Sequence, residues 1–101
     1  MPPTHEESDQ FWRDWSKLPD REQIAFRKTL KKFSEDIENL PQGEFRRSLR
    51  VKPMQGVPGI FEMTWQGADG RATFSYGAEV LEGVTHITWR RIGSHVIFND
   101  P

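Results

Sequence analysis

The second half of the chain, from residue 47 to residue 98, is built from short segments in which aromatic and β-branched residues alternate with polar ones. A period of two is typical of β-strands, because successive side chains of a strand point to opposite faces of a sheet. The sequence Gly67-Ala68-Asp69-Gly70 also predicts a hairpin turn. The alternating pattern predicts strands over about 47–52, 58–65, 71–77, 84–90 and 95–98.

The first half of the chain repeats with a helical period instead. Its apolar residues recur at intervals of three and four positions, which is the spacing of one face of a helix. Pro19 interrupts this pattern, and Pro41 with Gly43 ends it, so we expect a helical hairpin over about 9–40. The apolar positions are Phe11, Trp15 and Leu18 in the first helix and Phe26, Leu30, Phe33, Ile37 and Leu40 in the second.

Helices followed by a run of strands predict an α+β domain, with the N-terminal helical hairpin packed on one face of a small antiparallel β-sheet. The 101 residues are enough for one domain, which we place over 9–101. Residues 1–8 contain two prolines and two glutamates and little to bury, so we expect a flexible tail there. A core of this size predicts a substrate site on an open face or in a shallow groove.

The composition excludes several classes of function. Lys and Arg number 14 against 15 Asp and Glu, for a formal net charge of -1, so any RNA-binding argument depends on local patches. The absence of cysteine excludes disulfides, thiolate metal sites and cysteine catalysis. Three scattered histidines lack metal-ligand spacing, so we expect no metal and no cofactor. No apolar run approaches the roughly 20 residues of a membrane span, and we expect a cytoplasmic protein.

Three side chains of the strand-rich half are candidates for the chemistry itself. Arg71 follows the glycine turn, and its guanidinium can clamp a phosphate, although a solvated strand-end arginine is the ordinary alternative. His95 can act as a general acid or base, although a lone histidine is more often structural or merely exposed. Glu62 alternates with Phe61 and Met63 and so faces away from their layer, either as a base or as a cross-strand ion-pair partner.

Three further cations are candidates for binding RNA. Lys52 ends the first predicted strand, where a solubilising edge lysine is the plain alternative. Arg90 and Arg91 are adjacent on one strand, so alternation predicts that they point to opposite faces of the sheet. One of them can then join the open face while the other meets solvent or the helices, and the sequence leaves open which one.

Together these residue types fit a ribonuclease that works without a metal. RNA carries its own nucleophile, the 2′-OH, so such an enzyme needs a base, a phosphate clamp and an acid for the leaving oxygen. A glutamate or histidine, an arginine, and a histidine or lysine are sufficient for these three roles.

The order of these segments resembles the RelE/ParE superfamily of toxins from bacterial type II toxin–antitoxin systems. The resemblance runs from about Phe11 to Pro101 and looks closest to the HigB-like, phage-derived (Gp49-like) branch. It depends on a helical hairpin followed by LRVKPMQGVPGIFEMTW, GRATFSYG and HITWRRIGSHVIF in that order. The residues that match the family's motifs are Lys52, Met54-Gln55-Gly56, Gly59-Ile60-Phe61, Arg71 with Phe74 and Tyr76, Arg90, Arg91, His95 and Phe98.

The resemblance implies a fold of helices on a curved antiparallel sheet. It also implies metal-independent cleavage of mRNA by attack of the 2′-OH on the scissile phosphate, commonly on the translating ribosome. A small cognate antitoxin would neutralise the protein in a hetero-oligomer. By the same resemblance, Arg71 would clamp the scissile phosphate, and His95 would be the acid or base. Lys52 and Arg90 or Arg91 would assist binding.

Two other functions stay open at this point. A ParE-like toxin would act without nuclease chemistry, by binding a protein such as DNA gyrase, but His95 adds a titratable group that pure binding does not require. A catalytically silent RelE-fold domain would only engage an antitoxin or regulator. In favour of the silent domain, Phe98 stands where the family has a catalytic tyrosine, and the chain is slightly acidic where ribosome-directed toxins are usually basic.

Overall fold

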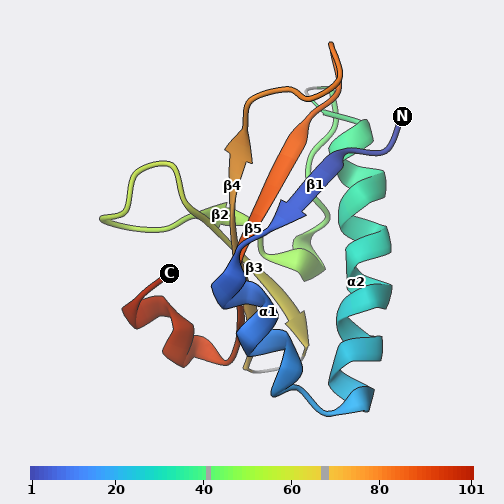
Figure 1. Cartoon of the computed structure of the whole chain (residues 1–101). Helices are drawn as coiled ribbons and strands as arrows, with labels where there is room; N and C mark the ends of the chain where they lie inside the picture. Colours follow the sequence, from blue (N-terminus) through green and yellow to red (C-terminus); the bar gives the residue numbers. More distant parts are fainter. Residues whose placement is uncertain (41, 67–68) are drawn as a thin grey trace.

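A computed structural model describes residues 1–40, 42–66 and 69–101 of the chain. Two helices and two short 3-10 helices (η) surround a five-stranded sheet, as Figure 1 shows. The elements in chain order are β1 (Thr4–Glu7), α1 (Asp9–Ser16), α2 (Asp20–Glu38), η1 (Arg47–Leu49), β2 (Lys52–Pro53), β3 (Phe61–Gln66), β4 (Gly70–Gly77), β5 (His86–Gly93) and η2 (His95–Asn99).

The strands are arranged in the order β1-β5-β4-β3-β2. Neighbours from β5 to β2 are antiparallel, but β1 runs parallel to β5. The predicted α+β class, with helices packed on a sheet, is therefore confirmed, whereas the expectation of a wholly antiparallel sheet is wrong. The sheet is mixed because the chain adds a strand before its helices.

Strand β1 lies in the segment that the sequence predicted to be a flexible tail, so that expectation does not hold for Thr4–Glu7. The side chains of this strand make polar contacts with β5, so its sequence lacks the apolar alternation that would have predicted a strand. The Thr4 hydroxyl lies 2.8 Å from Nδ1 of the buried His86 ring, and Glu6 lies 3.0 Å from its Nε2. His86 thus has a structural role in joining β1 to β5.

The helical hairpin is confirmed. Helix α1 begins after Ser8, whose hydroxyl accepts a hydrogen bond from the Phe11 N–H at 3.0 Å. Helix α2 begins after Pro19, with acidic residues in its first turn, where they complement the helix dipole. Pro41, the predicted helix terminator, lies outside the described residues.

Two predicted strands are wrong. Most of 47–52 forms η1 and a turn through Arg50, whose φ of 49° is left-handed, so only Lys52–Pro53 pairs as a strand. The segment 95–98 forms η2, because the Ser94 hydroxyl accepts the Val96 N–H and starts a helical turn. Gly67 and Ala68, half of the predicted hairpin turn, lie outside the described residues.

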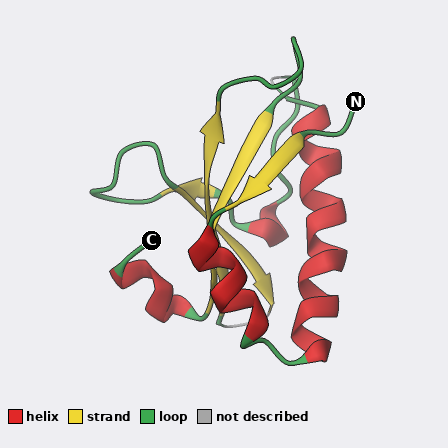
Figure 2. Cartoon of the chain, in the orientation of Figure 1, coloured by secondary structure: helices red, strands yellow, loops and turns green. Residues whose placement is uncertain are grey.

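Alternation along β3 and β4 gives the sheet two different faces, visible in Figure 2 as α2 on one side and η2 on the other. Met63 and Phe74 are fully buried toward α2, where the rings of Phe33 and Phe74 lie 5.1 Å apart. We call this side the α2 face. The opposite side, against which η2 packs, is the η2 face, and its residues are Glu62, Thr64, Arg71 and Thr73. No helix among the described residues is both long enough and apolar enough to cross a membrane.

Candidate functional site

Lys52 and Glu62 face each other across the β2–β3 pair on the η2 face. They are register partners, and the Lys52 ammonium lies 3.6 Å from Oε1 of Glu62. Lys52 is mostly exposed, whereas the Glu62 side chain keeps 17% of its surface. The geometry therefore supports the cross-strand ion pair and leaves the pair on the surface where a ligand could reach it.

Arg71 lies on the same face, one step along the sheet. Glu62 is opposite Thr73 and Arg71 is opposite Thr64, so Glu62 and Arg71 are diagonal neighbours on adjacent strands. Diagonal neighbours are about 7–8 Å apart, within reach of long side chains. The half-buried Arg71 also donates from Nη1 to the Gly70 carbonyl at 3.0 Å. A candidate base and a candidate phosphate clamp therefore share one surface.

Asp69 joins His95 to the start of β4. The His95 Nδ1 lies 2.6 Å from Oδ1 of Asp69, and the His95 backbone N–H donates to the same oxygen at 3.3 Å. These hydrogen bonds, with the nearby charge of Arg71, lower the pKa of Asp69. A carboxylate only accepts, so Nδ1 carries the proton and Nε2 is the ring nitrogen left to exchange a proton with a substrate.

A glycine and a capping serine bring His95 back to this place. Gly93 is the register partner of Arg71, and a Cβ added there would lie 3.1 Å from the Ile97 side chain. The chain can therefore turn back over β4 after Gly93, and Ser94 caps the η2 turn that follows. Phe98 lies half-buried in the same short helix and offers no proton to transfer.

Arg90 and Arg91 do not point to opposite faces as predicted. Thr73 pairs with Arg91 and Phe74 pairs with Trp89, so Arg90 is an extra residue in a β-bulge, and alternation fails there. Both guanidinium groups reach the end of the chain. Arg91 Nη1 lies 2.8 Å from the Asp100 main-chain oxygen, and Arg90 Nη2 lies 3.3 Å from that of Pro101.

Arg91 is also tied to α1. Its Nε donates to Oδ2 of the buried Asp14 at 2.7 Å, and the Ile92 N–H donates to the same oxygen at 3.2 Å. Burial alone would raise the pKa of Asp14, but hydrogen bonds from Arg91, Gln10 and Ile92 together hold that pKa below its ordinary value. Arg91 thus has a structural partner, and RNA binding by Arg90 or Arg91 stays a prediction.

The structure gathers the predicted residues into neighbouring groups on the η2 face. Lys52 and Glu62 form the first group. The second group consists of Arg71, Asp69 and His95, in which Asp69 is hydrogen-bonded to His95 and lies near the charge of Arg71. The sequence did not indicate Asp69 as a candidate site residue, because an aspartate between turn residues is ordinary and its partner is 26 positions away. Within the described ranges, no three His, Asp or Glu side chains gather closely enough to hold a metal ion.

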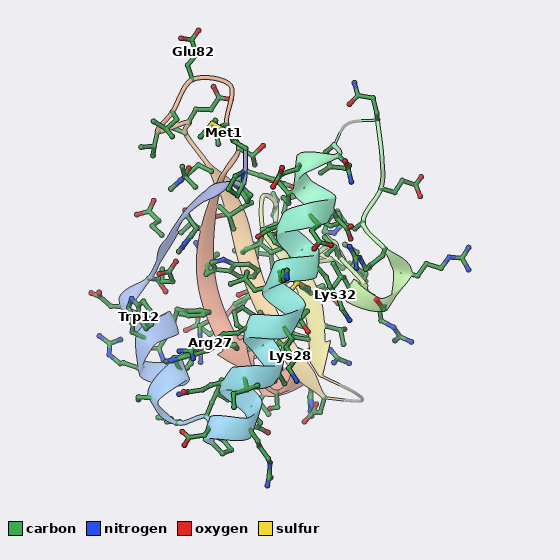
Figure 3. All side chains as sticks on the ribbon, turned by 90° about the vertical axis from the view of Figure 1, so that its right-hand side faces the viewer. Met1, Trp12, Arg27, Lys28, Lys32 and Glu82 are labelled. Carbon is green, nitrogen blue, oxygen red and sulfur yellow. The ribbon has the colours of Figure 1, made fainter. Side chains whose placement is uncertain are left out.

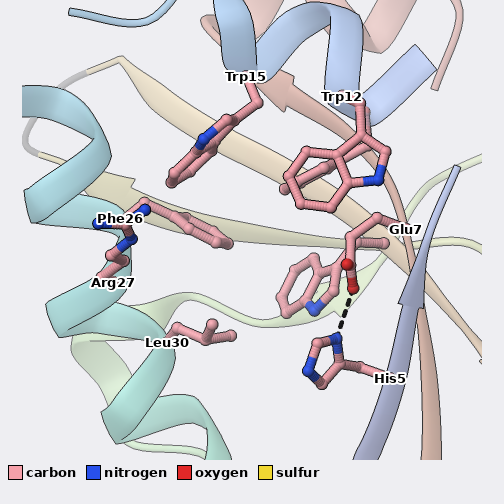
Figure 4. A pocket seen from close by; sticks show the side chains of 9 residues that line it. His5, Glu7, Trp12, Trp15, Phe26, Arg27 and Leu30 are labelled. Atoms are coloured by element: carbon pink, nitrogen blue, oxygen red, sulfur yellow. Dashed lines mark hydrogen bonds and ion pairs between the residues drawn. The ribbon is translucent and has the colours of Figure 1, made fainter. Parts of the chain in front are cut away.

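A separate apolar groove of about 160 Å³ lies on the other side of the molecule, between β1, α1 and α2. Figure 4 shows the side chains of Trp12, Trp15, Phe26 and Leu30 around it, with Glu7 and His5 hydrogen-bonded to each other at one wall. The Arg27 guanidinium lies 5.5 Å from the centre of the Trp15 ring at the opposite wall. None of these residues was predicted as a site residue.

Comparison with known proteins supports the fold. No family model matches the chain, and no curated protein matches it closely. Three solved structures are similar to the chain in fold. The Escherichia coli DinJ–YafQ complex matches with a TM-score of 0.56 and 17% identity, covering 93% of this chain and 94% of that chain. The Mycobacterium tuberculosis toxin–antitoxin complex RelBE2 matches with a TM-score of 0.55 and 21% identity, covering 94% of this chain and 100% of that chain.

The third structure is E. coli toxin RelE, as a mutant with two arginine-to-alanine substitutions, bound to a peptide of antitoxin RelBc. It matches with a TM-score of 0.53 and 14% identity, covering 99% of this chain and 94% of that chain. At identities this low, the structural similarity establishes a shared fold and nothing finer. The HigB-like branch stays a prediction. The chain has the RelE-like α+β fold, the fold of the toxins in these toxin–antitoxin complexes.

Proposed function

We propose that this protein is the toxin of a type II toxin–antitoxin pair and an mRNA endoribonuclease that requires no metal. The main observation is the second group on the η2 face, in which Asp69 orients His95 beside the charge of Arg71. The fold supports the proposal, because its neighbours are toxins in complex with antitoxins. An antitoxin is therefore the proposed partner, with mRNA on the translating ribosome as the proposed substrate.

In the proposed reaction, the 2′-OH of the RNA attacks the adjacent phosphorus and the bond from phosphorus to the 5′-oxygen breaks. Glu62 takes the proton from the 2′-OH, and His95, acting in the form that carries a proton on both ring nitrogens, gives its Nε2 proton to the leaving 5′-oxygen. Arg71 binds the phosphate oxygens and stabilises the charge that develops on them. The products are a 2′,3′-cyclic phosphate and a 5′-OH, and Lys52 with one of the β5 arginines assists RNA binding.

Asp69 is proposed as the residue that positions His95. A carboxylate on Nδ1 fixes the tautomer and orientation of the imidazole. Asp69→Asn should lower the cleavage rate about tenfold and alter its pH profile, because general acid catalysis contributes on the order of 10²–10⁴ and part of it would remain.

The direct test incubates the purified chain with end-labelled mRNA in EDTA, with and without ribosomes. We expect fragments that end in a 2′,3′-cyclic phosphate. Arg71→Ala and His95→Ala should each reduce the rate about 100-fold, the typical cost of losing a charge-stabilising or acid–base group. Arg21→Ala, which removes an exposed arginine on α2, is the matched control and should cleave normally.

Intact mRNA in both conditions would overturn the ribonuclease proposal. Inhibition of gyrase supercoiling by the same preparation would then support the ParE-like alternative. Antitoxin binding without either activity would support the catalytically silent domain. An independent measurement is the carbon NMR titration of Asp69, whose pKa should rise toward its ordinary value in His95→Ala.

A further inference from the structure

The apolar groove between β1, α1 and α2 has no part in the proposed chemistry, since it opens on the side of the sheet that carries α2. A cavity of roughly 150 Å³ with apolar walls is large enough to bind benzene. The groove, at about 160 Å³, therefore has room for one aromatic or branched apolar side chain. Trp12 at its rim is 51% exposed, so a partner that enters the groove can contact its indole ring.

Beside the groove, the middle of the exposed side of α2 is basic. Between positions 27 and 32 the sequence has four cations, Arg27, Lys28, Lys31 and Lys32, and no acidic residue. All four are exposed, and Figure 3 shows Arg27, Lys28 and Lys32 along the outer side of the helix, with Trp12 on neighbouring α1. This concentration stands out in a chain whose formal net charge is -1.

The spacing of these cations is unfavourable for the helix itself. Arg27 with Lys31 and Lys28 with Lys32 are like charges at i, i+4, each of which destabilises a helix by about 0.2–0.5 kcal/mol. Helix α2 also has no basic residue in its last turn, where a cation would be favourable, and the cations lie mid-helix instead. An anionic partner over this stretch would relieve the repulsion, and the groove beside it would take an apolar anchor.

We propose that the groove and the basic stretch of α2 form the docking surface for an acidic amphipathic helix of the antitoxin. One apolar side chain of that helix enters between Trp12, Trp15 and Leu30, and its carboxylates pair with Arg27, Lys28 and Lys31. RNA would satisfy the cations but leave the apolar wall formed by Trp15, Phe26 and Leu30 uncovered. Only the identity of the partner as an antitoxin rests on the proposed function.

Two synthetic amphipathic helical peptides test the surface directly. They share one apolar face with a central tryptophan, and their polar faces are all glutamate or all lysine. NMR titration of the whole chain should show tighter binding of the acidic peptide, by at least tenfold, with an affinity that falls as salt is added. The indole N–H signals of Trp12 and Trp15 should shift. The Trp65 signal is the internal reference, because its indole N–H donates to the Arg71 carbonyl at 2.8 Å inside the core.

Two variants separate the apolar and charged contributions. Trp12→Ala should weaken binding of the acidic peptide about tenfold, and Leu81→Ala, at another exposed apolar residue, should not change it. Lys28→Glu with Lys31→Glu should weaken binding at least tenfold. Arg21→Glu with Arg47→Glu is the control that changes the net charge equally at exposed positions away from the groove.

Equal affinity for both peptides, or shifts confined to the η2 face, would overturn the proposal. Displacement of the acidic peptide by an RNA duplex would also overturn it, in favour of a nucleic-acid surface. The antitoxin assignment is checked by coexpression with the proteins encoded on either side of this gene. One of them should rescue growth from the wild-type chain and fail to rescue it from Lys28→Glu with Lys31→Glu, and rescue by neither would contradict the assignment. Because all of these variants keep the η2 face, normal mRNA cleavage with lost neutralisation separates this proposal from the ribonuclease proposal.

Discussion

The α2 face and the η2 face are made by alternate residues of the same strands, yet they differ completely in chemistry. On the α2 face, aromatic rings from α1, α2 and the sheet interlock, with Phe74 in contact with Phe33, Phe61 and Trp89. On the η2 face, Glu62 and Arg71 lie between shorter polar side chains. The comparison teaches that one face carries the stability, so the other is free to carry charged groups.

The first prediction concerns the α2 face, where the largest effect on stability is expected. Phe74→Ala should lower the free energy of unfolding by about 4 kcal/mol, because a fully buried phenylalanine leaves a cavity that its neighbours cannot fill. Urea denaturation monitored by circular dichroism measures the loss. A loss below 1 kcal/mol would show that the two faces do not divide stability in this way.

The second prediction concerns the ion pair between Asp14 on α1 and Arg91 on β5. Asp14→Asn should cost about 2 kcal/mol, the usual contribution of hydrogen bonds to a charged group, because Asp14 accepts from both Arg91 and the Ile92 N–H. Urea denaturation measures this too. Gln10→Ala, which removes one weaker partner of the same carboxylate, is the control and should cost less.

The stabilisation by Asp14 also predicts a pH dependence. The pKa of Asp14 is lowered in the folded chain, so its contribution is complete above about pH 4, the ordinary unfolded value for aspartate. It is lost as the pH falls through the lower folded value. The stability difference between the wild-type chain and Asp14→Asn should therefore shrink below pH 4, and a constant difference down to pH 2 would contradict this assignment.

The third prediction concerns the connection from β5 to η2 on the η2 face. Gly93→Ala places a Cβ 3.1 Å from the Ile97 side chain, so η2 must shift by a few tenths of an ångström. We expect a cost of about 1 kcal/mol, typical of mild overpacking. The proposed RNA cleavage should fall more than stability does, because His95 moves with η2. Cleavage and unfolding measured on the same preparation compare the two effects.

The fourth prediction has the smallest effect and the opposite sign. Thr73 is fully buried on the η2 face, and its hydroxyl has no hydrogen-bond partner among the residues that the structure describes. Thr73→Val should raise the free energy of unfolding by about 0.5–1 kcal/mol, since it removes an unsatisfied buried polar group. Thermal unfolding can detect this gain, and a clear loss would indicate that the hydroxyl binds water.

The helices and the central strands could be predicted because their patterns are local. Spacing alone located α2, and alternation located β3, β4 and most of β5 and placed Glu62 away from the core. The wrong predictions are at positions where contacts with residues distant in the sequence determine the local structure. Strand β1 pairs with the distant β5, where His86 also contacts Thr4 and Glu6 through its ring nitrogens. The direction predicted for Arg90 is wrong because of a bulge in the pairing of β5 with β4.

The sequence by itself determined the α+β class and the identity of the charged residues on the strands, because side-chain period and residue chemistry are properties of neighbouring positions. Tertiary structure alone decided which of these residues meet. It paired His95 with Asp69 and Arg91 with Asp14, across 26 and 77 positions, and it brought α1 beside α2 to form the groove. Such contacts depend on strand order and on how the chain turns between elements, which no local pattern records.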